Sequence, residues 1–328
     1  MSGSGYTISE HRPDASETPR LANPDAFKGQ TVIVTGGTGK IGLQICRSLA
    51  ASGANVVVSD IRADPVHLLV KELTAEGYSA LAVPLSAVEG KKIVEQTLQK
   101  YGSLHAIVQP IIAPFQFIPF EKMPAEEFRN TFESDVMGPI AVMQAAWPHF
   151  QKQKYGRIVN FTSGAIFGME LASTYPTTKG ALLGLNKTLA EEGAPYNITV
   201  NCISPVGLYM EKQAKGVQDM LAKANGPFLK ASVPVANVPM VLALAHKNNK
   251  ASGEIFYTAA YGVFRHSMGM TTGLTDCTTV EKCLEKVPGI MDRGFRQIME
   301  PFSAHALGEY QAAYFLGTEK DFKAPSHL

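Results

Sequence analysis

Short runs of apolar and β-branched residues alternate with longer amphipathic stretches along most of this 328-residue chain. The runs that we predict to be strands are Thr31–Thr35, Asn55–Asp60, Ser79–Val83, Leu104–Val108, Arg157–Thr162, Ile198–Ile203 and Glu254–Thr258. Helical spacing of apolar residues predicts helices around Ile41 to Leu49 and over Pro65–Leu73, Lys92–Tyr101, Pro124–Phe150, Tyr175–Glu192 and Ala236–Ala245. Strands that alternate with helices form a parallel sheet covered on both faces. We therefore expect an α/β fold with a doubly wound, seven-stranded parallel sheet.

The alternating pattern covers only part of the chain, which suggests three segments. Residues 1–29 form a polar N-terminal tail that contains proline, and residues 30–262 hold the predicted strands and helices. Residues 263–328 form a C-terminal extension with helical signals of its own, at Thr278–Lys286, Ile290–Met299 and Glu309–Leu316. We expect one large α/β domain with these two appendages.

Composition excludes several classes of protein. Hydrophobic residues make up 45% of the chain and charged residues 18%, which excludes an intrinsically disordered protein. The formal net charge of +1, without a dense run of Lys or Arg, argues against a nucleic-acid partner. The most apolar stretch, residues 106–120, is too short and too rich in proline to span a membrane.

The cysteines, the histidines and the two ends of the chain bear on location and metal binding. Four cysteines are too few for a disulfide scaffold, and no signal-peptide pattern precedes the first strand, so we expect a cytoplasmic protein. The last three residues, Ser326-His327-Leu328, are a permissible variant of a peroxisomal address, which makes a peroxisome the alternative location in a eukaryote. His67, His105 and His149 are isolated, so we expect no metal site.

A glycine-rich turn joins the first predicted strand to the first predicted helix. The sequence Thr35-Gly-Gly-Thr-Gly-Lys-Ile-Gly42 allows a tight turn and lets the backbone and the helix N-terminus approach a pyrophosphate. Asp60 closes the second strand, where a carboxylate binds the ribose hydroxyls of a dinucleotide and repels a 2′-phosphate. The pattern therefore predicts NAD as cofactor, with NADP less favoured, although Arg62 softens that preference. The cofactor-binding residues predicted in the turn are Gly36, Thr38, Gly39, Lys40, Ile41 and Gly42.

A second group of residues carries the chemistry of proton transfer. Ser163 follows the strand Arg157–Thr162, while Tyr175 and Lys179 are four residues apart and share one face of the next helix. A phenol with a pKa of about 10 is a poor base at neutral pH, and a nearby ammonium lowers that pKa. Ser163 would bind the substrate oxygen on which charge develops. These three residues predict an enzyme that transfers a hydride and a proton.

In these motifs the chain resembles the short-chain dehydrogenases/reductases over residues 30–262. The likeness rests on the TGGTGKIG turn, Ser163 with YPTTK, and a Ser-Pro-Val-Gly element after the sixth strand. It implies a Rossmann fold, NAD or NADP, and an oxidoreductase in which Tyr175 is the acid/base and Lys179 binds the nicotinamide ribose. It also implies that Pro110, Tyr175, Lys179, Pro205, Val206 and Gly207 contact the cofactor, and that the protein is a homodimer or homotetramer.

The chain departs from the family pattern at several positions. Lys40 replaces the middle glycine of the turn, and the family's Asn-Asn-Ala-Gly motif after the fourth strand reads Gln109-Pro-Ile-Ile112. Asp135 stands where the family has a helix asparagine that relays protons to the lysine, and we include it in the catalytic set. Ser163 and Tyr175 are one residue closer in sequence than usual, and residues 84–87 lack the adenine-binding aspartate.

The expected substrate pocket is apolar. Residues that follow the fourth to sixth strands would line it and favour a hydrophobic hydroxy or keto compound, such as an acyl, terpenoid or steroid-like molecule, over a sugar. The residues we assign to this pocket are Ile112, Phe115, Phe167, Met169, Tyr209 and Met210, with Ile111 and Phe117 beside them.

Two other interpretations stay open. The stretches IIAPFQFIPF and SGAIFGMELASTY are similar in style to halohydrin dehalogenases, which suggests a non-redox enzyme, such as a dehalogenase, dehydratase or lyase, on the same fold. A cofactor-binding protein without catalysis is the other. The segment Gly253–Val263 and the residues after it weakly resemble the dehydrogenase part of peroxisomal multifunctional enzymes.

Overall fold

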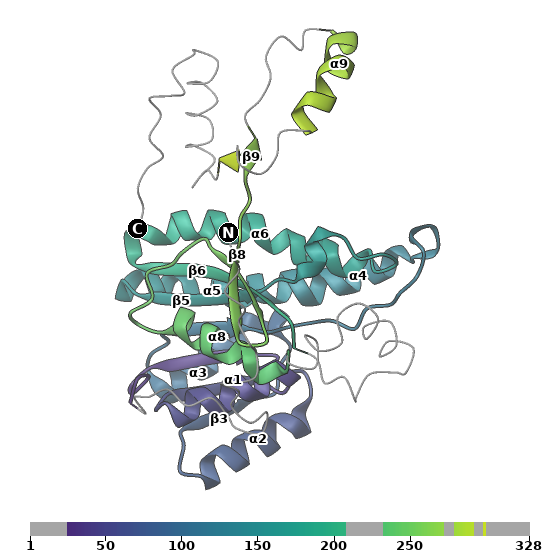
Figure 1. Cartoon of the computed structure of the whole chain (residues 1–328). Coiled ribbons are helices and arrows are strands. Elements are labelled where there is room, and N and C mark those ends of the chain that lie inside the picture. The colour runs from purple at the N-terminus through teal and green to yellow at the C-terminus, as the bar shows by residue number, and fades with distance from the viewer. Residues whose placement is uncertain (1–24, 208–231, 272–278, 292–297, 300–328) are drawn as a thin grey trace. The chain divides into compact units, whose positions relative to one another are not determined.

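A computed structural model describes residues 25–207, 232–271, 279–291 and 298–299 of the chain (Figure 1). It divides the chain into two compact units, Met1–Arg265 and His266–Leu328. The larger unit holds the glycine turn, Asp60 and the Ser163–Tyr175–Lys179 set. Tyr209, Met210, Cys277 and the tripeptide Ser326-His327-Leu328 lie outside the described residues.

The larger unit is built on an eight-stranded sheet in the order β3-β2-β1-β4-β5-β6-β7-β8. Neighbours from β3 to β7 pair in parallel, and β1 pairs with both β2 and β4, so the strand order reverses beside β1. This doubly wound parallel arrangement is the Rossmann-type fold that the sequence predicts. The strands are β1 (Thr31–Thr35), β2 (Asn55–Ser59), β3 (Ala80–Val83), β4 (Ala106–Gln109), β5 (Gly156–Phe161), β6 (Ile198–Pro205), β7 (Ile255–Ala259) and β8 (Gly262–His266).

The seven predicted parallel strands are present as β1 to β7, and the structure adds an eighth strand, β8, that the sequence does not predict. Ala260 and Tyr261 have φ angles of 49° and 64° and form a two-residue turn between β7 and β8. Two successive positive φ angles match the twist of a β-hairpin, a turn that usually contains Gly, Asn or Asp. The sequence Ala-Ala-Tyr-Gly carries no such signal at the two central positions, so the hairpin was not predicted.

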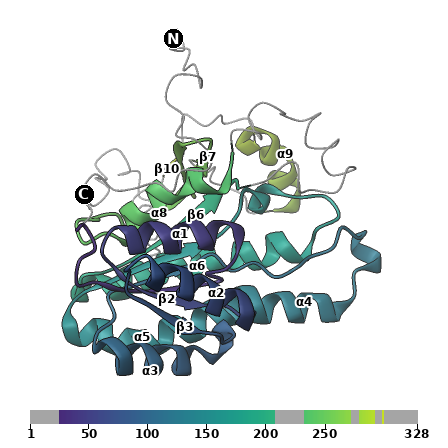
Figure 2. The ribbon, with the colours of Figure 1, turned by 90° about the horizontal axis from the view of Figure 1, so that it is seen from below.

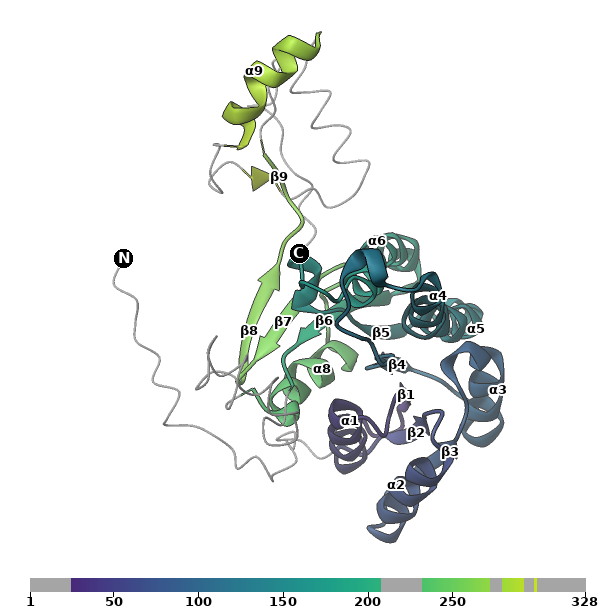
Figure 3. The same ribbon diagram turned by 90° about the vertical axis from the view of Figure 1, so that its right-hand side faces the viewer.

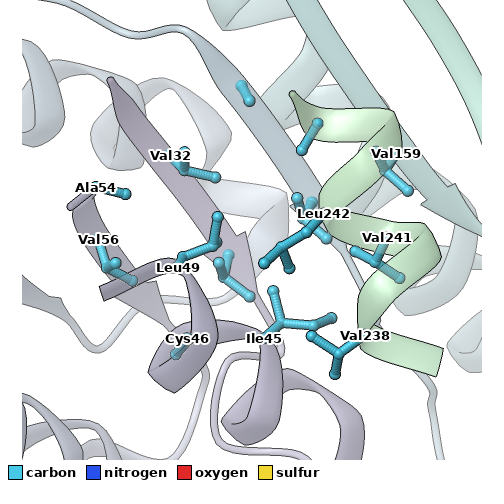
Figure 4. Packing of buried hydrophobic residues seen from close by; sticks show 14 of the residues in the cluster. Val32, Ile45, Cys46, Leu49, Ala54, Val56, Val159, Val238, Val241 and Leu242 are labelled. Atoms are coloured by element: carbon cyan, nitrogen blue, oxygen red, sulfur yellow. The ribbon is translucent and has the colours of Figure 1, made fainter. Parts of the chain in front are cut away.

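Helices cover both faces of the sheet (Figures 2 and 3). One buried cluster combines α1, α2 and α8 with strand residues such as Val32 and Val159 (Figure 4), and the other combines α3 and α5 with the opposite strand faces. The helices of this unit are α1 (Lys40–Ala51), α2 (Ala63–Ala75), α3 (Gly90–Tyr101), α4 (Ala125–Phe132), α5 (Gly138–Gln153), α6 (Thr174–Gly193) and α8 (Val238–Ala245). Short helical turns are η1 (Ala87–Glu89), η2 (Phe120–Lys122), η4 (Gly164–Phe167), η5 (Ala194–Tyr196) and η7 (Pro234–Asn237).

The segment predicted as one helix over Pro124–Phe150 is interrupted. A π-helical turn, η3 (Glu133–Met137), separates α4 from α5. Pro139 has no N–H to donate to the carbonyl of Asp135, four residues earlier, and its ring crowds that carbonyl. A wider turn accommodates the proline, and it places Asp135 in a fully buried position.

The folded unit also begins before residue 30. Phe27, which the sequence places in the N-terminal tail, is fully buried in the cluster with α1 and α8, and its ring packs edge-on against His246. The backbone N–H of Phe27 donates a hydrogen bond to the carbonyl of Ser52 at 2.9 Å. A single aromatic residue in a polar segment gives no periodic signal, so its burial was not predicted.

The smaller unit contains one described helix and one pair of short strands. They are α9 (Val280–Met291) and the antiparallel pair β9 (Met270–Thr271) and β10 (Ile298–Met299). The helix overlaps the predicted segment Thr278–Lys286, whereas Ile298 and Met299, predicted as helical, pair instead with β9. Such pairing depends on a distant partner that local periodicity does not reveal. The segment Glu309–Leu316 lies outside the described residues.

No helix in the described ranges is long and apolar enough to cross a membrane.

Close packing of α3 on α5 depends on a glycine. A Cβ built on Gly90 would overlap the backbone of Ala141 in α5. Gly90→Ala should therefore lower the free energy of unfolding by roughly 1–3 kcal/mol, because the helices must move apart. Urea unfolding measures this change. Gly184→Ala in α6 is the control, since its Cβ would meet nothing within 4 Å, and it should leave stability unchanged or raise it by up to about 1 kcal/mol. Equal stability of both variants would contradict the prediction.

Candidate active site

The predicted site residues follow strand ends at one edge of the sheet. The glycine turn follows β1, Asp60 follows β2, Pro110 follows β4, Ser163 lies two residues beyond β5, and Val206 follows β6. Parallel strands bring their carboxyl ends to the same edge, and ligands of doubly wound sheets bind there, next to the reversal of strand order. In this chain that reversal lies between β1 and β4.

The glycine turn has a geometry that larger residues would not allow. Gly36 has a φ angle of 66°, and a Cβ built on it would lie 3.1 Å from the carbonyl oxygen of Pro110. A Cβ on Gly42 would overlap the carbonyl of Gly36. The turn after β1 thus packs directly against the loop after β4, which brings two of the predicted cofactor-binding segments together.

Helix α1 presents its N-terminus at this edge. Its N-cap is Gly39, which makes no side-chain cap, and its first turn holds no acidic residue. The first N–H groups of a helix have no partner within the helix and carry partial positive charge, so they can bind a phosphate. Gly207, after β6, completes the neighbourhood, because a Cβ built on it would lie 2.9 Å from Ile41 Cδ1. The chain's residues here fit a pyrophosphate.

Asp60 is held by a dense set of hydrogen bonds. Its carboxylate accepts from Thr38 Oγ1 at 2.6 Å, and Arg62 donates from Nε to Oδ1 and from a terminal nitrogen to Oδ2, each at 3.1 Å. Burial alone would raise the pKa of Asp60, but the hydrogen bonds from Arg62 and Thr38 outweigh it, so the pKa lies below the usual value. The Arg62 side chain remains 54% exposed.

Ser163 and Tyr175 lie within reach of each other. Ser163 Oγ accepts a hydrogen bond from the backbone N–H of Ala165 at 3.1 Å, which fixes the hydroxyl at the start of η4. The Tyr175 ring stacks on Phe115, with ring centroids 4.4 Å apart and an interplanar angle of 7°. Burial raises the pKa of Tyr175, the hydrogen bond with Ser163 works against this, and the charge of Asp135 adds to the increase.

Lys179 and Asp135 form a buried ion pair. Lys179 Nζ lies 3.0 Å from Asp135 Oδ2, and the two side chains are only 2% and 0% exposed. The ammonium also donates to the carbonyl of Ile111 at 2.8 Å, and Asp135 Oδ1 accepts from the backbone N–H of Ala113 at 2.6 Å. The pair therefore ties α6 and η3 to the loop that follows β4.

The structure alters one expectation about this pair. The sequence suggests that Lys179 lowers the pKa of Tyr175, yet this pKa lies above the usual value. Lys179 Nζ is 5.8 Å from the centroid of the Tyr175 ring, and its charge is compensated by Asp135. A neutral asparagine at position 135 would leave that charge uncompensated. Burial lowers the pKa of Lys179, and the nearby charge of Asp135 offsets part of this decrease.

The altered motif after β4 contains a residue with a structural role, Gln109, that the sequence did not reveal. Gln109 is buried, and its side-chain amide donates to Asn160 Oδ1 in β5 at 3.0 Å and to the carbonyl of Pro139 in α5 at 3.3 Å. It thus links β4 to β5 and to the start of α5. A long amide at the end of a strand is the only signal for this in the sequence, and it does not name the partners.

The predicted substrate residues divide between exposed and half-buried positions. Ile112, Phe167 and Met169 are 56%, 76% and 39% exposed, and Phe115 is half-buried against Tyr175. A hydrogen bond of 2.7 Å from the N–H of Ile118 to the carbonyl of Leu171 joins the two loops that carry them. The apolar side chains therefore gather on adjoining loops beside Tyr175.

Metal ligands are not clustered in the part of the chain that the structure describes: no three His, Cys, Asp or Glu residues there could hold a metal ion together.

Residues 30–220 match the protein family described as short chain dehydrogenase. The chain belongs to this family of oxidoreductases. It is 32% identical over 265 residues to the peroxisomal hydratase-dehydrogenase-epimerase of Neurospora crassa, covering 77% of this chain and 29% of that protein. An uncharacterized oxidoreductase of Bacillus subtilis is 32% identical over 207 residues, covering 62% of this chain and 80% of its relative.

A structural comparison agrees with the fold. The full-length peroxisomal multifunctional enzyme type 2 from Drosophila melanogaster matches with a TM-score of 0.71 at 23% identity, over 90% of this chain and 50% of that one. The chain spans less than a third of the length of its Neurospora relative. The resemblance to short-chain dehydrogenases that the sequence suggests is therefore confirmed at the level of family and fold.

The hydrogen bonds to Asp60 make stability depend on pH. A carboxyl group with a pKa lowered by folding stabilises the protein above its unfolded pKa, near 3.8, and this contribution is lost as the pH falls through the folded value. Asp60→Asn should therefore destabilise the chain by roughly 1 kcal/mol at neutral pH, and the difference from the wild type should shrink below about pH 4. Urea unfolding at several pH values measures it. Asp64→Asn, which removes an exposed carboxylate in α2, is the control. A difference that does not change with pH would contradict the assignment.

Proposed function

We propose that this chain is an NAD-dependent oxidoreductase that interconverts a hydrophobic secondary alcohol and its ketone, with Tyr175 as acid/base. The observation that carries the proposal is that Ser163, Tyr175 and the buried Lys179 lie together: Lys179 Nζ is 5.8 Å from the centroid of the Tyr175 ring, and Ser163 is near enough to act on the pKa of Tyr175. They lie at the strand edge that also carries a glycine turn and an uncapped helix N-terminus.

Ser163 and Tyr175 have different roles at the substrate oxygen: Ser163 binds it, and Tyr175 exchanges a proton with it. The Ser163 oxygen accepts from Ala165, so its own hydrogen is available to a substrate carbonyl or to Tyr175. In the direction of reduction Tyr175 donates its phenolic proton to the carbonyl oxygen, and in the direction of oxidation the phenolate takes the alcohol proton. Bound NAD supplies the hydride chemistry at its nicotinamide ring.

Lys179 has one donor to offer the cofactor. Its ammonium carries three N–H donors, and the contacts with Asp135 and Ile111 use two of them. The third can bind a ribose hydroxyl, which is the role that the family resemblance implies. The glycine turn and the N-terminus of α1 would hold the pyrophosphate, with Gly207 close to the side chain of Ile41.

The surroundings of Asp60 support NAD over NADP. A 2′-phosphate would face a buried carboxylate that stays ionised at neutral pH, since hydrogen bonds from Arg62 and Thr38 hold its pKa low. The ribose hydroxyls of NAD can instead donate to that carboxylate.

The apolar residues near Tyr175 support a hydrophobic substrate. Phe115 covers one face of the Tyr175 ring, and Ile112, Phe167 and Met169 present exposed apolar side chains on the neighbouring loops. A ligand with an acyl, terpenoid or steroid-like body would bury this surface. A sugar would leave its hydroxyls without partners there.

A groove between α5 and α6 supports self-association. It has a volume of about 290 Å³ and is lined mainly by apolar side chains, among them Ile140, Trp147, Leu185 and Leu189. An apolar groove on two neighbouring helices fits the packing of a second copy of the chain, in a homodimer or homotetramer.

Removal of the phenolic hydroxyl tests the acid/base assignment. Tyr175→Phe should reduce kcat by at least about 10²-fold, the usual contribution of general acid/base catalysis, and should leave NAD binding within about twofold. Turnover is followed by nicotinamide absorbance over a panel of ketones and secondary alcohols, and binding by calorimetry. Tyr101→Phe removes a hydroxyl that bonds Ser79 far from the site and is the control. Retained activity would refute the role of Tyr175, and product formation without a change in absorbance would favour a non-redox enzyme.

Cofactor selectivity tests the role of Asp60. The wild type should bind NAD at least about tenfold more tightly than NADP. Asp60→Ala should reduce this difference in affinity, because Arg62 is then free to bind the 2′-phosphate. Calorimetric titration with each dinucleotide measures both affinities without turnover. Equal affinity of the wild type for the two cofactors would show that Asp60 does not select between them.

A further inference from the structure

Asp135 is fully enclosed and fully hydrogen-bonded. It lies in the π-helical turn between α4 and α5 and is 0% exposed. Both carboxylate oxygens have partners: Oδ1 accepts from Ala113 N–H at 2.6 Å, and Oδ2 contacts Lys179 Nζ at 3.0 Å and Thr178 Oγ1 at 3.4 Å. A buried carboxylate with these partners acts over short distances through a medium of low dielectric.

Two opposite charges therefore share the buried space around Tyr175. Lys179, from α6, is positive, and Asp135, from η3, is negative. Among the residues that the structure describes, Cys202 in β6 also acts on Lys179, and burial raises the pKa of its thiol to about 12, so it is neutral at physiological pH. The charged side chains of α4, which also packs on α6, point outward: Glu126 and Arg129 pair with each other at the surface, and Glu127 accepts from Gln116.

The pair carries no net charge near the phenol. The carboxylate of Asp135 opposes ionisation of Tyr175 and offsets the positive charge of Lys179, whose Nζ lies 5.8 Å from the centroid of the Tyr175 ring. Burial of the Tyr175 ring under Phe115 acts in the same direction as Asp135. A phenolate would thus form in an apolar place with no net positive charge beside it.

We propose that Asp135 is a positioning residue that keeps Tyr175 a neutral phenol at neutral pH, set to donate its proton to a ketone. This inference rests on the proposed function, because it sets the direction in which the same site works best. Ketone reduction uses the protonated phenol and runs at neutral pH. Alcohol oxidation requires the phenolate and becomes fast only at alkaline pH. The equilibrium of the reaction is unchanged, and only the pH range of each direction is set by Asp135.

The competing explanation is that Asp135 only anchors the loop after β4. Asp135→Asn separates the two, because asparagine keeps one acceptor oxygen, which can still hold the N–H of Ala113, but removes the negative charge and the acceptor for Lys179. If the charge matters, this variant frees the positive charge of Lys179 to stabilise the phenolate. If only the anchor matters, the ionisation of Tyr175 does not change.

Direct titration of the phenol tests the proposal without substrate or cofactor. The full chain is labelled with ¹³C at the phenolic carbon of tyrosine, and its spectrum is recorded as a function of pH; Tyr175→Phe identifies the Tyr175 resonance among those of the eleven tyrosines. We expect Tyr175 of the wild type to remain protonated up to about pH 10. Asp135→Asn should increase its ionisation constant by about tenfold or more.

A matched control removes a charge from the same turn. Glu133→Gln takes an exposed carboxylate from η3 and should leave the titration of Tyr175 unchanged. An Asp135→Asn variant with the wild-type titration, or a wild-type Tyr175 that ionises below about pH 9, would overturn the proposal. The second outcome is decisive even if Asp135→Asn does not fold.

Rate measurements then separate this inference from the proposed function. With a ketone and an alcohol that the wild type turns over, Asp135→Asn should shift the pH profiles of reduction and oxidation toward lower pH by the same amount as the titration. A change in rate without a shift in the profiles would indicate a structural role alone and contradict the inference. Absence of turnover in the wild type would refute the proposed function, while the titration would still decide what Asp135 does to Tyr175.

Discussion

Parallel pairing of strands is the constraint on which the rest of this structure depends. Because β1 to β7 run in the same direction, each strand delivers the residue after its last hydrogen bond to one edge of the sheet. The order reverses beside β1, and there the turn after β1 meets the loop after β4, at the edge where doubly wound sheets bind their ligands. The contact of Gly36 with Pro110 marks that place. A glycine turn, a carboxylate and a Ser–Tyr pair, far apart in the sequence, thereby come to the same edge of the sheet.

The ion pair between Lys179 and Asp135 joins this edge to the helices behind it. Burying two charges costs free energy that their attraction only partly returns, so such a pair is weak support for stability by itself. Its contacts indicate another role, because it fixes the backbone at Ile111 and Ala113 and so positions the loop that carries Phe115. The same carboxylate compensates the ammonium of Lys179 beside Tyr175. Loop position and the protonation of the phenol are therefore linked through one side chain.

Much of the fold was predictable because its signals are local. β1 occupies the predicted residues, and β2 to β7 differ from the predicted runs by at most two residues at either end, since apolar β-branched runs and intervening helical faces need no knowledge of distant partners. The features that were not predicted have no clear signal in their own sequence. β8 depends on a hairpin turn with positive φ at Ala260 and Tyr261, β10 depends on pairing with β9, and Phe27 is buried by α1 and α8, which come later in the chain. The π turn at Glu133–Met137 arises from Pro139 but leaves the apolar periodicity almost unchanged.

The sequence by itself determined the family, the doubly wound sheet, and the residue types that gather at its edge, because each rests on short motifs and on the spacing of apolar residues. It also identified Asp135 as one of the departures from the family pattern. Only the tertiary structure decided what that departure does. The distance between Asp135 and Lys179 is set by how η3 packs on α6, and the stacking of Phe115 on Tyr175 is set by the path of the loop after β4. Electrostatic effects depend on distance and burial, which a linear sequence does not contain.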